Sequence, residues 1–306
     1  MILVTGSSGL IGRHLCARLQ AEGLEVRRFD LRENPAEDNP AVRKSIRNVS
    51  GVVHLAAVSR VQWAQEDPDL CKTTNVAAVK MLTDLCLEAR PKPWLLFSSS
   101  REVYGNPVRL PVREDDALAP VNVYGRSKRD AETIISAARE AGLLANICRF
   151  SNVYGCPFDH ETRVTMAFAR VAARGGRMFV EGGENTFDFT DVGDVVDGIW
   201  RLIQETTANK RLPPIHFASG QGTTLRELAQ MAADRALFPV EIVDAMHRPF
   251  DVSAFVGDPG RAWRLLGWRT QTSLGYGLSR LIADLSEARF PSTRDYTGEN
   301  CQVPSR

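Results

Sequence analysis

A glycine-rich turn near the amino terminus constrains the fold of this chain more than any other feature. The turn follows the apolar run at residues 2–4 and opens directly into a helical pattern. A helix that starts this way presents unpaired backbone N–H groups and a partial positive charge, which bind a pyrophosphate. The glycines let the backbone pass close to that pyrophosphate. We therefore predict a dinucleotide site that contacts Gly6, Gly9, Leu10, Ile11 and Gly12.

A carboxylate follows the turn at the spacing typical of such a site. Asp30 lies 18 positions after Gly12, at the tip of the second expected strand (residues 24–29). There it can accept hydrogen bonds from the adenosine ribose hydroxyls, which favours NAD over a 2′-phosphorylated cofactor. The nearby arginine is the type of side chain that can meet a 2′-phosphate. We predict NAD as the cofactor, with the adenosine ribose beside Asp30, Leu31 and Arg32.

Composition argues against several classes of partner. The 306 residues carry a formal net charge of +1, which gives no reason to expect nucleic acid or an anionic membrane. No apolar run approaches the roughly 20 residues that span a bilayer, and no secretory signal precedes the first strand. The six cysteines and five histidines are scattered, so we expect reduced thiols and no metal site. These features predict a soluble, cytoplasmic, metal-free protein.

Apolar runs alternate with helical patterns through the first half of the chain. Alternation of this kind is typical of βαβ units, whose parallel strands are buried on both faces. It predicts an α/β fold with a doubly wound parallel (Rossmann) sheet. The expected strands are residues 2–5, 24–29, 51–56, 94–99 and 145–150, and the expected helices between them include 12–22, 75–89 and 130–141.

After residue 155 the regular alternation fades, because glycine and proline pairs interrupt shorter elements. One helix there, expected at 224–235, begins with a capping box formed by Thr224 and Glu227. This pattern predicts a smaller mixed α/β C-terminal substrate lobe, interleaved with the sheet. The predicted division is an NAD-binding domain at 1–155, onto which 188–204 packs back, a substrate lobe at 156–290 and a tail at 291–306.

Tyr124 and Lys128 form a second motif, a Tyr-x-x-x-Lys pair about one helical turn apart. On a helix the two side chains share a face, and the ammonium favours the phenolate, which predicts a Tyr124 pKa lowered toward neutrality. The phenolate can then accept the proton of an alcohol that is being oxidised. Ser100 ends a serine-rich strand some 24 residues upstream and can offer a hydroxyl to the same alcohol.

Taken together, these motifs resemble the extended short-chain dehydrogenase/reductase superfamily, in its NAD-dependent nucleotide-sugar epimerase/dehydratase branch. The resemblance covers roughly residues 1–285 and includes 5–12, 52–57, 149–155 and 248–251 in the family's order. It implies Ser100, Tyr124 and Lys128 as the catalytic residues. Beyond the turn and Asp30, the cofactor residues that it implies are Leu55, Ala56, Ala57, Asn75, Ser98, Tyr124 and Lys128.

The same resemblance implies that a nucleotide sugar is the substrate. Asn152 and Arg248 would face its diphosphate, and Asp251 would orient that arm, while Cys156 lies at the edge of the sugar pocket. Ser100 and Arg101 complete the expected substrate contacts. Relatives usually carry an arginine where this chain has Phe187, so one phosphate anchor is missing or relocated. A homodimer is also implied by the family.

The branches of this superfamily share a first step, in which the tyrosine takes the C4 hydroxyl proton while hydride passes to NAD. Glu102 resembles the base of 4,6-dehydratases, which removes the C5 proton so that the C6 hydroxyl leaves as water. In those enzymes an aspartic acid usually precedes that glutamate and protonates the leaving hydroxyl. Here Arg101 stands in its place.

Several interpretations fit a site in which the base, Glu102, is present and the usual aspartic acid before it is replaced by Arg101. Elimination can give a 4-keto-6-deoxy sugar, or stop at the 5,6-ene as in the hexosamine 5,6-dehydratase of tunicamycin biosynthesis, which this chain resembles. Alternatively, Glu102 binds a hydroxyl and the enzyme is a UDP-sugar 4-epimerase. A non-catalytic NAD-binding regulatory module is a third hypothesis, against which the intact Ser100, Tyr124 and Lys128 argue. We favour Glu102-dependent dehydration of a UDP-hexose or hexosamine such as UDP-GlcNAc, with Cys156 as a candidate acid or a pocket-lining thiol.

Overall fold

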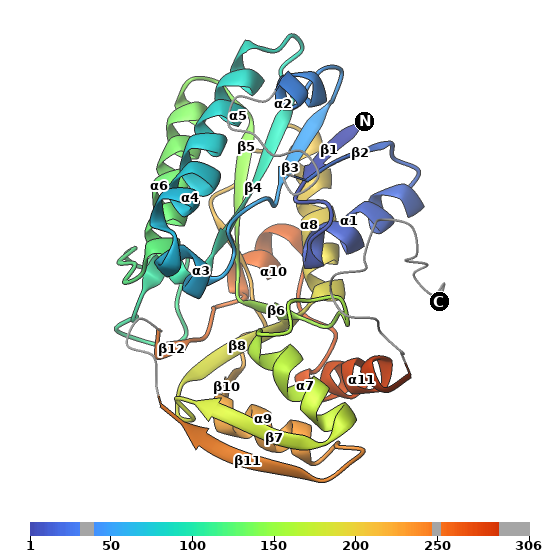
Figure 1. Cartoon of the computed structure of the whole chain (residues 1–306). Helices are drawn as coiled ribbons and strands as arrows, with labels where there is room; N and C mark the ends of the chain where they lie inside the picture. The colour runs from blue at the N-terminus through green and yellow to red at the C-terminus, as the bar shows by residue number, and fades with distance from the viewer. Residues whose placement is uncertain (31–39, 247–251, 288–306) are drawn as a thin grey trace.

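The structure, a computed structural model, describes residues 1–30, 40–246 and 252–287 (Figure 1). Four of the predicted site residues and the predicted tail lie outside these ranges; the four residues are Leu31, Arg32, Arg248 and Asp251. No helix within the described ranges is long and apolar enough to cross a membrane.

The apolar runs of the first half pair into one six-stranded sheet, in the order β2-β1-β3-β4-β5-β9, and every pair is parallel. The ends of the first five strands lie within two residues of those expected from the sequence. β9 adds a sixth strand from beyond residue 200. The predicted α/β fold with a Rossmann sheet is therefore confirmed. The strands are β1 (Ile2–Thr5), β2 (Val26–Phe29), β3 (Gly51–His54), β4 (Trp94–Ser100), β5 (Ala145–Phe150) and β9 (Ile215–Phe217).

Helices cover both faces of this sheet because successive side chains of a strand point to opposite faces. Leu3 packs in the core beneath α5 and α6, whereas its neighbours Ile2 and Val4 pack in the core beneath α1 and α8 (Figure 1). The helices of these layers are α1 (Leu10–Ala21), α2 (Pro40–Ser45), α5 (Ala78–Glu88), α6 (Val123–Glu140), α8 (Val192–Thr207) and α10 (Gly260–Leu266).

A second apolar core lies under smaller sheets in the lower part of Figure 1. β8 pairs with β6, β10 and β12, and β7 pairs with β11. The elements are β6 (Asn152–Tyr154), α7 (Val164–Arg174), β7 (Gly176–Glu181), β8 (Thr186–Asp191), β10 (Gly222–Thr224), α9 (Leu225–Ala233), β11 (Val240–Ala245), β12 (Ala254–Phe255) and α11 (Leu274–Glu287). The division of the chain into an NAD-binding domain and a substrate lobe stays a prediction.

The structure tests two of the expected helix starts. The capping box of α9 is present, with Thr224 and Glu227 bonded reciprocally. α6 begins at Val123 and not near 130 as expected, because the Asn122 side chain caps it by accepting the N–H of Gly125 at 2.8 Å. The earlier start places the Tyr-x-x-x-Lys pair within the first two turns of a helix.

Short helices complete the surroundings of the site. α3 (Val61–Glu66) and α4 (Pro68–Lys72) follow β3, and a π-helical turn, η1 (Thr73–Ala77), joins α4 to α5. A 3₁₀ turn, η2 (Arg101–Tyr104), follows directly on β4. Ser100 caps that turn through its hydroxyl, so the end of β4 and the residues after it form one continuous, buried segment.

Candidate active site

The glycine turn between β1 and α1 leaves no room for a side chain at Gly6 or Gly12. Gly6 has a φ of +67°, and a Cβ there would lie 2.7 Å from the backbone nitrogen of Ala56. A Cβ on Gly12 would lie 2.2 Å from the carbonyl oxygen of Gly6. The N-cap residue of α1 is Gly9, and no side chain of the described residues caps it. This cradle of bare backbone at a helix start fits the pyrophosphate of a dinucleotide.

The predicted ribose carboxylate lies beside this turn. Asp30 follows β2, is buried, and accepts the backbone N–H of Ser8 through Oδ2 at 3.1 Å. This contact fixes the carboxylate against the glycine turn, at the end of the strand next to β1. The geometry agrees with a hydroxyl-binding carboxylate at the adenosine end of the site.

The loop after β3 forms another wall. Leu55, Ala56 and Ala57 follow the end of the strand, and Leu55 donates its N–H to the Thr5 carbonyl at 3.2 Å. Asn75 holds this loop from η1, because its amide both accepts from and donates to the backbone of Val58, at 2.8 and 3.1 Å. The same amide donates to Ser127 of α6 at 2.9 Å. Asn75 therefore fixes the loop relative to α6, and its direct contact with the cofactor stays a prediction.

The structure brings the predicted catalytic residues together at the end of β4. Ser100 lies beside the phenol of Tyr124 and acts to lower its pKa, and both side chains are buried. Lys128 lies on the same face of α6, with Nζ 5.9 Å from the centroid of the Tyr124 ring. The ammonium donates to the carbonyl of Ser98 at 2.9 Å. A hydroxyl, a phenol and an ammonium thus converge in one buried space.

The electrostatics of this group differ from the sequence expectation. Burial raises the pKa of Tyr124 to about 12, although the hydrogen bond from Ser100 opposes the shift. The prediction that Lys128 lowers the Tyr124 pKa toward neutrality is therefore wrong, because desolvation outweighs any effect of the nearby ammonium. Burial also lowers the pKa of Lys128 to about 8, since the ammonium is far from water. The spacing argument considered the pair alone, whereas desolvation acts on both members.

Glu102 lies in η2, directly beside Ser100, whose hydroxyl accepts the Glu102 N–H at 3.2 Å. The carboxylate is buried and held on both oxygens. Oε1 pairs with Nη2 of Arg101 at 2.9 Å, and Oε2 accepts from the Asn122 amide at 2.7 Å. Glu102 also raises the pKa of Tyr124 by its charge, so the carboxylate is electrostatically coupled to the phenol.

Arg101 turns toward Phe187 of β8, with its guanidinium carbon 4.4 Å from the ring centroid. Its Nε approaches Oδ1 of Asn152 at 3.3 Å. Nη1 is buried and has no hydrogen-bond partner among the residues that the structure describes. The structure therefore joins the two departures from the family pattern, Arg101 and Phe187, in one contact. Cys156 is buried after the turn at Gly155, and its role stays a prediction.

Sequence reasoning missed two residues of this site. Asn122 both caps α6 and holds Glu102, and its position before a helical run was a recognisable capping signal. Arg163 lowers the pKa of Tyr124 by its charge, which places a cation of the segment before α7 near the phenol. It pairs with Asp159 at 3.0 Å. No local pattern marked Arg163, because its proximity to α6 depends on the fold.

A buried polar network supports the segment that carries these residues. Glu132 of α6 accepts the Ser99 hydroxyl at 2.5 Å and pairs with Arg149 at 2.6 Å. Arg149 also donates to the Tyr104 hydroxyl at 2.5 Å, and that oxygen contacts Nε2 of His216 at 2.6 Å. Both ends of the 99–104 segment are thereby anchored to α6, β5 and β9.

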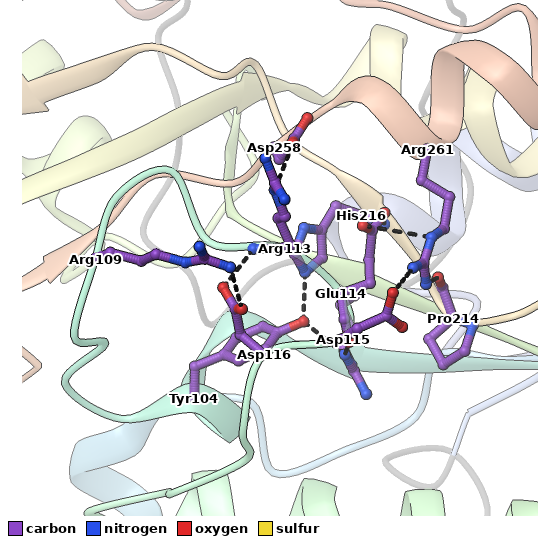
Figure 2. A network of polar contacts seen from close by, with 11 residues as sticks. Tyr104, Arg109, Arg113, Glu114, Asp115, Asp116, Pro214, His216, Asp258 and Arg261 are labelled. Atoms are coloured by element: carbon purple, nitrogen blue, oxygen red, sulfur yellow. Dashed lines mark hydrogen bonds and ion pairs between the residues drawn. The ribbon is translucent and has the colours of Figure 1, made fainter.

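The network continues into the loop after η2. Figure 2 shows Tyr104 and His216 close to Glu114, whose carboxylate accepts the His216 backbone N–H at 3.1 Å. Arg261 of α10 lies 3.6 Å from the same carboxylate and donates to the Pro214 carbonyl at 3.0 Å. Burial lowers the pKa of His216 to about 3, so its ring stays neutral. These contacts tie the loop to the sheet and to α10.

Comparison with known proteins agrees with this geometry. The profile of the NAD dependent epimerase/dehydratase family matches residues 2–213. The chain belongs to this family. Its predicted membership is confirmed, and it is an NAD-dependent enzyme of the nucleotide-sugar epimerase and dehydratase type.

Individual members of the family resemble the chain over most of its length. A UDP-glucose 4-epimerase of Lactobacillus helveticus is 26% identical over 302 residues, covering 88% of this chain and 91% of the relative. MoeE5 in complex with UDP-glucuronic acid and NAD superposes with a TM-score of 0.84 at 27% identity, covering 94% and 98% of the two chains. TunA, an NAD-dependent NDP-hexosamine 5,6-dehydratase of tunicamycin biosynthesis, superposes with a TM-score of 0.83 at 28% identity and the same coverage. The prediction of NAD as the cofactor is confirmed.

Proposed function

We propose that this family member is an NAD⁺-dependent dehydratase that removes water across C5 and C6 of a UDP-linked hexose or hexosamine. One observation carries the proposal: the Glu102 carboxylate is buried next to Ser100 and coupled to Tyr124, with donors on both oxygens. Such a carboxylate is held ready to accept a proton beside the carbon that is oxidised. The similarity to TunA supports the reaction, and that to MoeE5 with UDP-glucuronic acid supports UDP.

The first step is oxidation at C4. Tyr124 takes the proton of the C4 hydroxyl, and Ser100 donates a hydrogen bond to the same oxygen. The Lys128 ammonium, anchored on the Ser98 carbonyl, favours the phenolate and would hold the nicotinamide ribose. NAD⁺, when bound, supplies the acceptor for the C4 hydride and returns that hydride later in the cycle. The glycine turn and Asp30 would hold its pyrophosphate and adenosine ribose.

The second step is elimination. The C4 ketone acidifies the C5 hydrogen, and Glu102 removes it as a proton. The electron pair of that bond forms the C5–C6 double bond, and the C6–O bond breaks. Arg101 cannot supply the proton that the leaving oxygen needs, because a guanidinium stays protonated in proteins. In this proposal Glu102 returns the C5 proton to that oxygen, so that water leaves and the carboxylate is restored; Cys156 stays the alternative acid.

A UDP-sugar 4-epimerase is the second candidate function. It is favoured by one observation: both oxygens of Glu102 are already engaged by the protein, Oε2 by the Asn122 amide and Oε1 by the ion pair with Arg101, as in a structural carboxylate. In that case the C4 ketone would turn in the pocket and receive the hydride on its other face. Glu102 would then shape the pocket without moving a proton.

Mass spectrometry and proton NMR of UDP-GlcNAc and UDP-glucose incubated with the enzyme in D₂O test the proposal. We expect loss of about 18 mass units, the mass of one water by arithmetic, with vinyl or 4-keto-6-deoxy signals. Glu102→Gln should abolish water loss and keep C4 oxidation, whereas Glu22→Gln, a surface control at the C-terminal cap of α1, should keep both. A C4-inverted product of unchanged mass without deuterium at C5 would establish epimerisation instead.

A further inference from the structure

The guanidinium of Arg101 is held on three sides. The Phe187 ring lies against its face, Asn152 approaches Nε, and Glu102 pairs with Nη2. These contacts restrict a long side chain that would otherwise sample many rotamers. The aromatic face and the carboxylate both stabilise a cation at this position. Arg101 is therefore preorganised in the site.

One donor of this fixed group is unused. Nη1 is buried, and it has no hydrogen-bond partner among the described residues. A buried donor without an acceptor is unfavourable, and such groups in folded proteins call for an explanation such as a catalytic role. Because Nη1 and Nη2 belong to one planar guanidinium, the unused donor lies next to the Glu102 carboxylate.

We propose that Nη1 of Arg101 donates a hydrogen bond to the C6 oxygen of the substrate and makes it a better leaving group. This inference rests on the proposed dehydration, in which Glu102 acts at C5. The C6 oxygen is the acceptor attached next to C5, and it gains negative charge as the C6–O bond breaks. A fixed cationic donor stabilises that charge without transferring its own proton. Glu102 delivers the proton, so that the bond changes at C5 and C6 balance as written above.

A different role for the same guanidinium is to bind the substrate diphosphate. Asn152, which contacts Nε, is the residue that the family resemblance places at the diphosphate. Both roles need the positive charge, but they act at different stages. A diphosphate contact holds the substrate before and after reaction, whereas a C6 contact matters only when the C6–O bond breaks.

The test compares UDP-GlcNAc with its 6-deoxy-6-fluoro analogue in Arg101→Met. Fluoride is a weaker base than hydroxide and leaves without a donor of this strength. The measured quantity is the ratio of elimination to C5 deuterium exchange in D₂O, with water loss followed by mass spectrometry and fluoride by an ion-selective electrode. We expect the ratio for UDP-GlcNAc to fall by about 100-fold or more, as for loss of one preorganised donor. The ratio for the fluoro analogue should stay close to that of the unchanged enzyme.

Two further variants make the result decisive. Arg177→Met removes an arginine that stacks on Phe179 at 5.3 Å and pairs with Glu241 at 3.1 Å on the exposed face of β7, so it should leave both ratios unchanged. Phe187→Leu keeps Arg101 but removes the aromatic ring that lies against its guanidinium. This variant should also lower the UDP-GlcNAc ratio, by a smaller factor than Arg101→Met. If Arg101→Met does not fold, Phe187→Leu provides the comparison.

Three outcomes would overturn the inference. An equal rise in KM for both substrates, with unchanged ratios, would place Arg101 at the diphosphate. An equal fall of both ratios would show that Arg101 acts on C5 and not on the leaving group. Unchanged ratios and KM values would remove any role in the reaction. If the unchanged enzyme releases neither water nor fluoride, the proposed dehydration itself fails, and that result is distinguishable from all three.

Discussion

Replacing Glu132 by glutamine leaves the Arg149 guanidinium buried without its counter-charge. The two side chains are 7% and 4% exposed, and their two contacts measure 2.6 and 2.9 Å. Burial alone would lower the pKa of Arg149, but the bonds and charge of Glu132 outweigh it and raise the pKa well above its ordinary value. Breaking such a pair typically costs about 3–5 kcal/mol. The folding equilibrium should therefore shift by more than about a hundredfold.

Urea unfolding followed by tryptophan fluorescence measures this cost. The matched control is Glu22→Gln, which breaks the pair with Arg18 at 2.7 Å, where both side chains are about one third exposed. That exposed pair should contribute about 0–1 kcal/mol. A Glu132→Leu/Arg149→Leu double variant should cost less than Glu132→Gln alone, because it leaves no unpaired charge. If Glu132→Gln costs no more than Glu22→Gln, the argument that the buried charge dominates is refuted.

Three further predictions concern the site. Tyr124→Phe should reduce turnover by about 10²–10⁴-fold, as for loss of a general base, while NAD released on denaturation stays stoichiometric; normal turnover would exclude this base. Because burial holds the Lys128 pKa at about 8 against 10.5 in a free side chain, turnover should fall as pH rises through about 8. Stability should rise between those two pH values, since there the unfolded chain binds more protons, and Lys128→Met should remove this rise in urea titrations. Gly12→Ala, whose Cβ would lie 2.2 Å from the Gly6 carbonyl oxygen, should lose bound NAD in native mass spectrometry, whereas Gly23→Ala should keep it.

The sheet and the cofactor turn could be predicted because their signals are local. A buried parallel strand is an apolar run, and the glycine turn and Asp30 have a fixed order along the chain. The helix expected at 130–141 starts later than α6, because Gly125 and Ser127 are weak helix formers, whereas the Asn122 cap starts α6 at Val123. That Ser100 lies near Tyr124 could be predicted because Ser100 ends a strand and Tyr124 belongs to the helix that follows that strand in the chain.

The buried hydrogen-bond network that supports the site could not be predicted from local sequence patterns. Tyr104 and His216 lie 112 positions apart, and Arg101 and Asn152 lie 51 apart, so their contacts depend on how β4, β6 and β9 come together. By residue type, Arg101 and Asn152 would be expected at the surface, and Tyr104 and His216 would be expected only partly buried. Their burial follows from mutual hydrogen bonding, which no single segment of sequence contains.

The charges around Tyr124 explain why the test of Arg101 must use a ratio. The carboxylate of Glu102 raises the pKa of the phenol, and Arg101 partly neutralises that carboxylate through the ion pair at 2.9 Å. Removing Arg101 exposes Tyr124 to the full charge of Glu102, which disfavours the phenolate and slows C4 oxidation for every substrate. C5 exchange and elimination both follow that oxidation, so its slowing cancels when one is divided by the other. An effect on the C6–O bond remains in the ratio, and it separates hydroxide from fluoride as the leaving group, whereas an effect at C5 changes both ratios alike.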